Sequence, residues 1–160
     1  MLNFRWNISH NPRLRREVEQ KLHAVALALG VRDEDEATIV VCADRRITTL
    51  NTRYRRQSET TDVLSFPCDT PLLAPGKRVS IAKKQPPRLL GDIFVNLRQV
   101  ERQAKRNGNS VADEMAAATT HGLLHLLGLR HKGKADTEKM LAEEKRLFKL
   151  ACIEVVEFGH

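Results

Sequence analysis

The chain has 160 residues, of which 41% are hydrophobic and 29% are charged. No apolar run approaches the roughly 20 residues that a membrane-spanning helix needs, so we expect one soluble domain over residues 1–160 and no membrane partner. Lysine and arginine outnumber aspartate and glutamate by 27 to 20, and this excess favours phosphate-rich partners. The three cysteines lie far apart without a CxxC pair, which argues against disulfides and for a reducing compartment.

The first half of the chain predicts two strands, each followed by a helix. Residues 2–8 alternate between apolar and polar side chains, as a strand does, although the acid-free basic start could also belong to a mitochondrial targeting segment. An Asn-Pro pair then opens a helix over residues 11–30 with apolar side chains at helical spacing. Residues 37–43 form a β-branched run typical of a buried strand, and Asp44 is placed to cap the following helix.

The second half of the chain predicts two more strands and three helices. Residues 63–66 and 89–95 read as strands, and the basic, proline-containing stretch between them predicts a long loop or an irregular hairpin. The helices are predicted over residues 96–107, 110–127 and 136–150, and Ser110 is placed to cap the second of them. This irregular order indicates an α+β domain in which helices cover a mixed β-sheet.

Basic residues gather in two groups. One lies on the predicted helix after Asp44, and the other lies in the segment before residue 89. The first group comprises Arg45, Arg46, Arg53, Arg55 and Arg56, and the second comprises Lys77, Arg78, Lys83, Lys84 and Arg88. A single run of this kind is usually a solvated face, but two groups flanking one site favour contact with a nucleic-acid backbone.

Three of the six histidines fall within one short segment at the end of the predicted helix 110–127. His121 and His125 are four residues apart, so their side chains lie one turn apart on the same helix face. Gly128 can end the helix in the left-handed conformation and turn the chain back, so that His131 reaches the same point. Because unrelated histidines rarely show this spacing, we predict that one metal ion binds all three.

A site of this composition predicts hydrolytic chemistry. Zinc held by three neutral imidazoles keeps a fourth position for water, whose pKa falls to about 7. The spacing HxxxHxxGxxH is also that of metzincin proteases, which carry a glutamate as general base after the first histidine. This chain has Gly122 at that position, which disfavours a peptidase.

The histidine segment, residues 121–131, resembles the signature of the YbeY family of ribosomal-RNA-processing endoribonucleases. Three further blocks match this family in order and spacing: residues 50–55 (LNTRYR), 61–67 (TDVLSFP) and 90–93 (LGDI). The resemblance implies a zinc-dependent, single-strand-specific endoribonuclease that acts in ribosomal RNA maturation and ribosome quality control. It also implies one zinc ion per chain, held by the three histidines.

The resemblance further implies roles for residues outside the histidine segment. Arg55 aligns with a family arginine that faces the metal cleft, where its planar fork would stabilise developing phosphoryl charge, although it could be an ordinary surface residue. The expected substrate-binding residues are Arg53, Arg56 and Ser65, with Thr61 and Asp62 as further candidates for the cleft wall. Asp62 could equally cap a turn, and Ser65 could simply fill a strand.

Two further positions, Arg130 and Cys68, bear on the predicted metal site. Arg130 stands where bacterial family members usually have an aspartate before the third histidine. If that aspartate orients a ligand, this chain needs a substitute, whereas little changes if it only shapes the turn. Cys68 follows a predicted strand and could contact the metal, but a small core residue is the better interpretation.

Two rival functions stay open. The first is a ribosome-associated assembly factor whose zinc is mainly structural, and the second, less favoured, is a metalloprotease. For the leading function the expected partners are single-stranded RNA, ribosomal RNA and the ribosome or its small-subunit proteins. We expect a cytoplasmic protein, with a mitochondrial or plastid matrix as the alternative.

Overall fold

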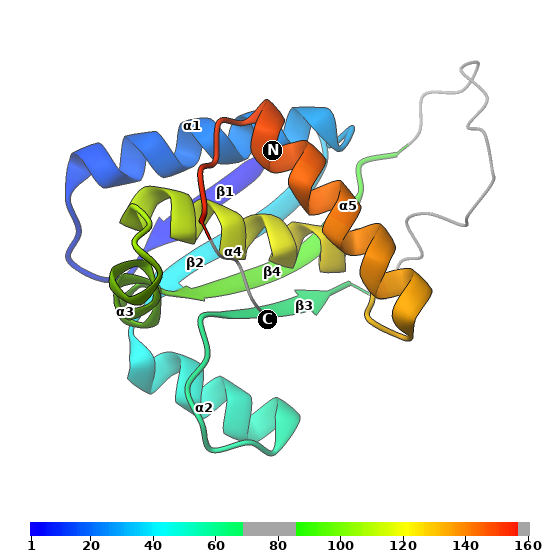
Figure 1. Cartoon of the computed structure of the whole chain (residues 1–160). Coiled ribbons are helices and arrows are strands. Elements are labelled where there is room, and N and C mark those ends of the chain that lie inside the picture. Colours follow the sequence, from blue (N-terminus) through cyan, green and yellow to red (C-terminus); the bar gives the residue numbers. More distant parts are fainter. Residues whose placement is uncertain (69–85, 157–160) are drawn as a thin grey trace.

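Within the described part of the chain, residues 1–68 and 86–156, four strands form one sheet in the computed structural model (Figure 1). The strands are β1 (Leu2–Trp6), β2 (Glu36–Cys42), β3 (Val63–Pro67) and β4 (Leu89–Asn96), and their spatial order is β1-β2-β4-β3. β2 runs parallel to both β1 and β4, whereas β3 pairs with β4 antiparallel at the edge. The predicted mixed sheet is therefore confirmed.

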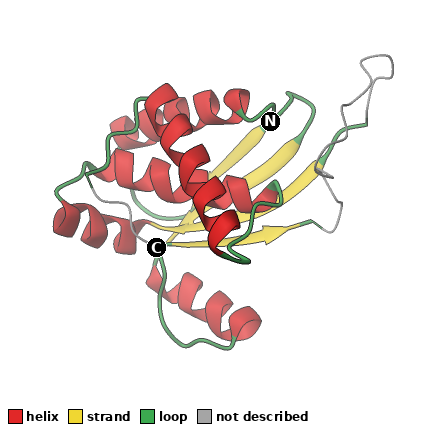
Figure 2. Ribbon diagram, turned by 45° about the vertical axis from the view of Figure 1, so that its right-hand side comes forward, coloured by secondary structure: helices red, strands yellow, loops and turns green. Residues whose placement is uncertain are grey.

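The helices of the described residues cover both faces of this sheet unequally. They are α1 (Pro12–Ala28), α2 (Asp44–Arg55), α3 (Leu97–Asn107), α4 (Val111–Leu126) and α5 (Lys134–Leu150). Helices α1 and α4 pack side by side on one face, α5 packs across both, and α2 lies on the opposite face (Figures 1 and 2). The predicted α+β class is confirmed. No helix in these ranges is long and apolar enough to cross a membrane.

Helix α4 is the central helix, because it is buried on nearly all sides. Residues 116–118 are all alanine and none is exposed. At Gly122, an added Cβ atom would lie 2.9 Å from Oγ of Ser65 and 3.0 Å from Cγ2 of Ile93. Such small side chains let the helix approach the sheet closely, so the C-terminal end of α4 is held against β3 and β4.

The predicted helix caps are confirmed at two positions and wrong at a third. The side chain of Asn11 accepts a 2.8 Å hydrogen bond from the backbone N–H of Arg13 at the start of α1. Ser110 likewise accepts one of 3.0 Å from a backbone N–H in the first turn of α4. Asp44 does not cap α2, because Ala43 occupies the N-cap position and Asp44 is already the first helical residue.

The carboxylate of Asp44 instead links three parts of the fold. It accepts hydrogen bonds from the side chains of Asn96 at 2.8 Å, Thr60 at 3.3 Å and Arg102 at 2.5 Å. The hydrogen bonds from Arg102 and Asn96 lower the pKa of Asp44 to about 2. Since Asn96 ends β4 and Arg102 lies on α3, this network fixes the first turn of α2 against both elements.

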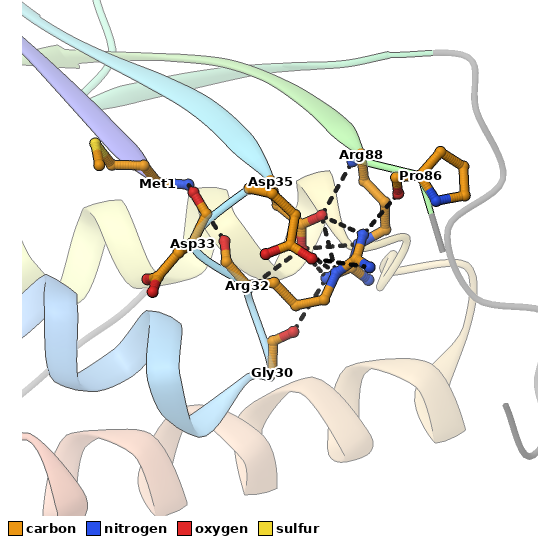
Figure 3. A network of polar contacts seen from close by, with 8 residues as sticks. Met1, Gly30, Arg32, Asp33, Asp35, Pro86 and Arg88 are labelled. Atoms are coloured by element: carbon orange, nitrogen blue, oxygen red, sulfur yellow. Dashed lines mark hydrogen bonds and ion pairs between the residues drawn. The ribbon is translucent and has the colours of Figure 1, made fainter. Parts of the chain in front are cut away.

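Asp35 forms the centre of a second polar network (Figure 3). Its side chain is fully buried and accepts hydrogen bonds from the backbone N–H and the guanidinium groups of Arg32 and Arg88. Arg88 also donates to the carbonyl of Gly30 at 3.0 Å, and Arg32 donates to that of Pro86 at 2.8 Å. The network therefore joins the turn after α1 to the segment that leads into β4.

The second basic group of the sequence is only partly placed by the structure. Lys77, Arg78, Lys83 and Lys84 lie outside the described residues, as does most of the predicted loop or hairpin. The remaining member, Arg88, is engaged with Asp35 inside the fold. Arg88 therefore serves the fold, and the predicted second flank of the site stays a prediction.

Removing the carboxylate of Asp35 is expected to destabilise the fold. Burial alone raises the pKa of Asp35, but the hydrogen bonds from Arg88 and Arg32 outweigh burial and hold the pKa well below its usual range. The substitution Asp35→Asn leaves both guanidinium groups around an uncharged side chain, so the free energy of unfolding should fall by about 3 kcal/mol at pH 7. Urea unfolding measures this difference.

The same substitution has an expected pH signature. A carboxyl group whose pKa is depressed by folding stabilises the native state above its unfolded pKa, which is about 3.9, and this contribution is lost as the pH falls further. The difference in unfolding free energy between wild type and Asp35→Asn should therefore be constant at neutral pH and shrink below about pH 4. A difference that does not change with pH would contradict the role of this charge.

Candidate metal centre

The three predicted metal ligands meet at one point. His121 and His125 lie in the last turns of α4, and His131 lies on the connection to α5. One side-chain nitrogen from each histidine lies within 4.8 Å of the other two. His121 is buried, His125 is half-buried and His131 is exposed, so the group opens to solvent on the side of His131.

Gly128 produces the chain reversal that the sequence predicts. Its φ angle is +95°, in the region that favours glycine. Its backbone N–H donates to the carbonyl of His125 at 3.0 Å, and the N–H of Leu129 donates to that of Leu124 at 3.0 Å. These hydrogen bonds close the end of α4 and turn the chain so that His131 faces the two helical histidines.

Hydrogen bonds to oxygen atoms orient both helical imidazoles. Nδ1 of His125 lies 2.9 Å from the carbonyl oxygen of Leu129, and Nδ1 of His121 lies 2.5 Å from Oε1 of Glu144. An imidazole whose Nδ1–H donates to oxygen presents the lone pair of Nε2 at its other end. The two Nε2 atoms indeed face one another at 2.8 Å. Two facing lone pairs need a shared proton or a cation between them, and this donor set suits a transition metal ion.

Glu144 is a site residue that the sequence analysis missed. It lies on α5, and its side chain is buried, as are those of Met140 and Leu147 on the same helix face. A carboxylate at an otherwise apolar helical position was the available signal, because such a group needs a polar partner. The partner, His121, is 23 positions away in the sequence, so helix periodicity could not identify it.

The environment of His125 favours the neutral imidazole. Burial, together with smaller effects of the neighbouring His121 and the positive charge of Arg55, lowers the pKa of His125 to about 4. At neutral pH the ring therefore keeps the lone pair that a metal ion requires. The effect of Arg55 also shows that its charge lies close enough to act on this site.

The other predicted site residues lie on α2, directly after it, or on β3. Arg55 is the exposed last residue of α2, and Arg56 follows it in the left-handed conformation, with φ of 55°. The guanidinium of Arg53 lies over the ring of Tyr54, 5.5 Å from its centroid. Ser65 lies on β3 and faces Gly122 of α4. Their contacts with substrate stay predictions.

The lesser candidates have local roles. The carboxylate of Asp62 accepts hydrogen bonds from the backbone N–H of Val63 at 2.9 Å and the hydroxyl of Thr61 at 3.1 Å, which are its two neighbours in the sequence. Cys68 is half-buried, and its backbone N–H donates to the carbonyl of Leu90. Cys68 is not one of the residues whose ligand atoms converge.

The close packing of Gly122 against the sheet explains why α4 carries no protease-type general base at this position. Gly122 occupies the position of the metzincin glutamate, but it faces the sheet. A Cβ atom there already lies within 3.0 Å of Ser65 and Ile93. A glutamate at this position would therefore force the side chains of Ser65 and Ile93 to move.

These observations define a class of protein: an α+β domain in which the central helix and the turn after it bring three histidines together at one candidate metal site. The sequence model of the family described as Endoribonuclease YbeY matches residues 2–151. The chain belongs to the YbeY family, as its sequence motifs predict.

Individual relatives agree with this assignment. The protein named Endoribonuclease YbeY of Anaeromyxobacter dehalogenans is 37% identical over 135 residues, which are 84% of this chain and 63% of the relative. That of Bacillus pumilus is 33% identical over 131 residues, covering 82% and 81%. The chain thus spans less than two thirds of some curated relatives. The solution structure of TM1509 from Thermotoga maritima shares the fold, with a TM-score of 0.64, 21% identity and coverage of 94% and 89%.

Proposed function

We propose that this chain is a zinc-dependent endoribonuclease that cleaves single-stranded RNA during ribosomal RNA maturation and ribosome quality control. One observation carries the proposal: two Nε2 atoms, each oriented by a hydrogen bond at Nδ1, meet a third histidine, and the charge of Arg55 at the end of α2 acts on His125. The name shared by the curated relatives supports RNA as the substrate class. Ribosomal RNA and small-subunit proteins, in a cytoplasmic setting, are the partners that the proposal includes.

Zinc is the metal ion that this donor set fits best, at one ion per chain. Three neutral imidazoles with one side open to solvent are typical of catalytic zinc sites, which keep a free position for water. Such an ion, when bound, supplies a water of lowered pKa and polarises a phosphoryl oxygen. His121, His125 and His131 would hold it, and the carbonyl of Leu129 and the carboxylate of Glu144 keep two of these rings in the required tautomer.

Arginine side chains of α2 would bind and orient the phosphodiester. Arg55 is proposed to pair with the phosphoryl oxygens, because its charge already acts on His125 and its fork suits bidentate contacts. Arg53 and Arg56 would hold neighbouring phosphates of the strand, and Ser65 would offer its hydroxyl at the edge strand. Among residues 1–68 and 86–156, we assign no carboxylate as general base.

Replacing Arg55 with alanine tests this role. We expect kcat for cleavage of a single-stranded RNA to fall about 10²–10³-fold, since a donor aimed at developing charge is lost. Zinc content should stay at the wild-type value, because Arg55 is not a ligand. Arg45→Ala is the matched control, about 15 Å away along the same helix, and it should change KM rather than kcat. Equal kcat for Arg55→Ala and wild type would refute the assignment.

A further inference from the structure

A cavity of about 460 Å³ lies between the end of α4 and the first turns of α5. It is lined by residues 127–129 and by the side chains of Arg130, Lys132, Asp136 and Lys139. The cavity is therefore built on the same connection that carries His131. Its volume is in the range of pockets that bind small ligands or one unit of a polymer.

The cavity carries an excess of positive charge. Three of its lining residues are cations and one, Asp136, is a carboxylate, and all four are exposed. Among the residues that the structure describes, none of the three cations forms an ion pair. The first turn of α5 adds the partial positive charge of a helix N-terminus. Cations that line one cavity and form no ion pair are stabilised when an anion binds among them.

The cavity and the metal centre occupy two sides of one loop. Arg130 and Lys132 flank His131 in sequence, and both line the cavity while His131 does not. His131 instead turns towards the other two histidines. Leu129 lines the cavity and also accepts the hydrogen bond from Nδ1 of His125. An anion bound in the cavity would therefore restrain the loop that presents the exposed ligand His131.

We propose that this cavity is a phosphate-binding site, filled either by a backbone phosphate of a single-stranded RNA or by free inorganic phosphate. Arginine and lysine side chains are the usual partners of phosphate groups. The RNA source rests on the proposed function, whereas binding of inorganic phosphate does not depend on it. With an RNA strand, the site holds a phosphate beside the loop that carries His131, whereas α2 with its arginines lies on the opposite face of the sheet from α4 (Figure 1). The strand is then held by two separate basic groups.

Two variants with opposite expected effects test the site in the metal-loaded protein. Arg130→Ala/Lys132→Ala removes two of the cations, and Asp136→Asn removes the single carboxylate. The double variant Arg13→Ala/Arg16→Ala is the matched control, because it removes two exposed charges from α1. One probe is a short, fluorescein-labelled, 2′-O-methylated single-stranded RNA that resists cleavage, followed by fluorescence anisotropy. The other is inorganic phosphate, followed by the shift that it causes in the thermal unfolding midpoint at constant ionic strength.

We expect the Arg130/Lys132 variant to bind the RNA about tenfold more weakly than the control. The slope of log K against log salt concentration should become shallower by about 0.7 for each lost phosphate contact. Asp136→Asn should bind RNA more tightly than wild type. A phosphate-induced shift that disappears in the Arg130/Lys132 variant, with RNA binding unchanged, would support the site with free phosphate as its source. If neither probe distinguishes this variant from the control, the cavity binds no phosphate and the proposal fails. If the wild-type protein does not cleave RNA, the proposed function is wrong, but the phosphate measurement still tests the site.

Discussion

Replacing either His121 or His125 with alanine is expected to remove the bound metal and RNA cleavage together. Each ring presents one Nε2 atom to the common point, and two remaining donors bind zinc far more weakly than three. Wild-type protein should contain one zinc per chain by elemental analysis, and both variants should contain almost none. Cleavage of single-stranded RNA, measured on the same samples, should fall by at least about 10³-fold, because the activated water is lost with the metal.

The design of this experiment also separates the leading function from its rival. His131 is the exposed one of the three histidines, so the substitution His131→Ala disturbs packing least. This variant is therefore the one expected to stay folded without metal. Circular dichroism should show native helix content in any variant that is compared. Folded, metal-free His131→Ala that does not cleave RNA but still supports ribosome assembly in cells would favour the assembly factor, whereas wild-type cleavage by this variant would contradict a catalytic metal. Wild-type protein that folds without metal would overturn the zinc assignment itself.

The parts of this molecule that follow local patterns are those that the sequence predicts. The ends of the helices agree with the structure within two residues, because caps and apolar spacing act over a few positions. The metal ligands were predicted for the same reason: four residues make one helical turn, and Gly128 permits the reversal to His131.

The interactions that sequence patterns could not reveal are between distant elements. The order β1-β2-β4-β3 depends on which strands meet, and an apolar run carries no label for its neighbour. Arg88 looked like one more basic residue of an exposed group, but it pairs with Asp35, 53 positions earlier. Asp44 has the right residue type for an N-cap, yet hydrogen bonds from Asn96 and Arg102 place its carboxylate elsewhere.

Sequence patterns do not reveal the cavity beside the metal centre, for a related reason. Its three cations are spread over ten positions, and a turn and the carboxylate of Asp136 separate them. A search for runs of like charge finds the first group on α2 but not this one. The replacement of an aspartate by Arg130 was visible in the sequence, although only the structure shows which side of the loop this side chain occupies.

Glu144 is expected to control the affinity of the centre for its metal without being a ligand. Its carboxylate holds Nδ1 of His121 at 2.5 Å and is itself almost fully buried, so it fixes both the tautomer and the plane of that ring. Replacing Glu144 with alanine should weaken zinc binding about 10–100-fold, measured by competition with a chromogenic chelator. Glu144→Gln keeps a hydrogen-bond acceptor but loses the charge, so its affinity should lie between those of alanine and wild type.

Two controls separate this positioning role from a general loss of structure. Glu143→Gln changes the neighbouring residue, whose carboxylate pairs with Arg146 at the surface, and it should leave zinc affinity unchanged. Leu147→Ala opens a cavity beside the same helix and should lower the free energy of unfolding by about 2–5 kcal/mol. It removes no candidate ligand, so zinc affinity should again be retained. If Glu144→Ala binds zinc as tightly as Leu147→Ala does, Glu144 only fills space. If its affinity falls while Glu144→Gln recovers part of the loss, the carboxylate acts through His121.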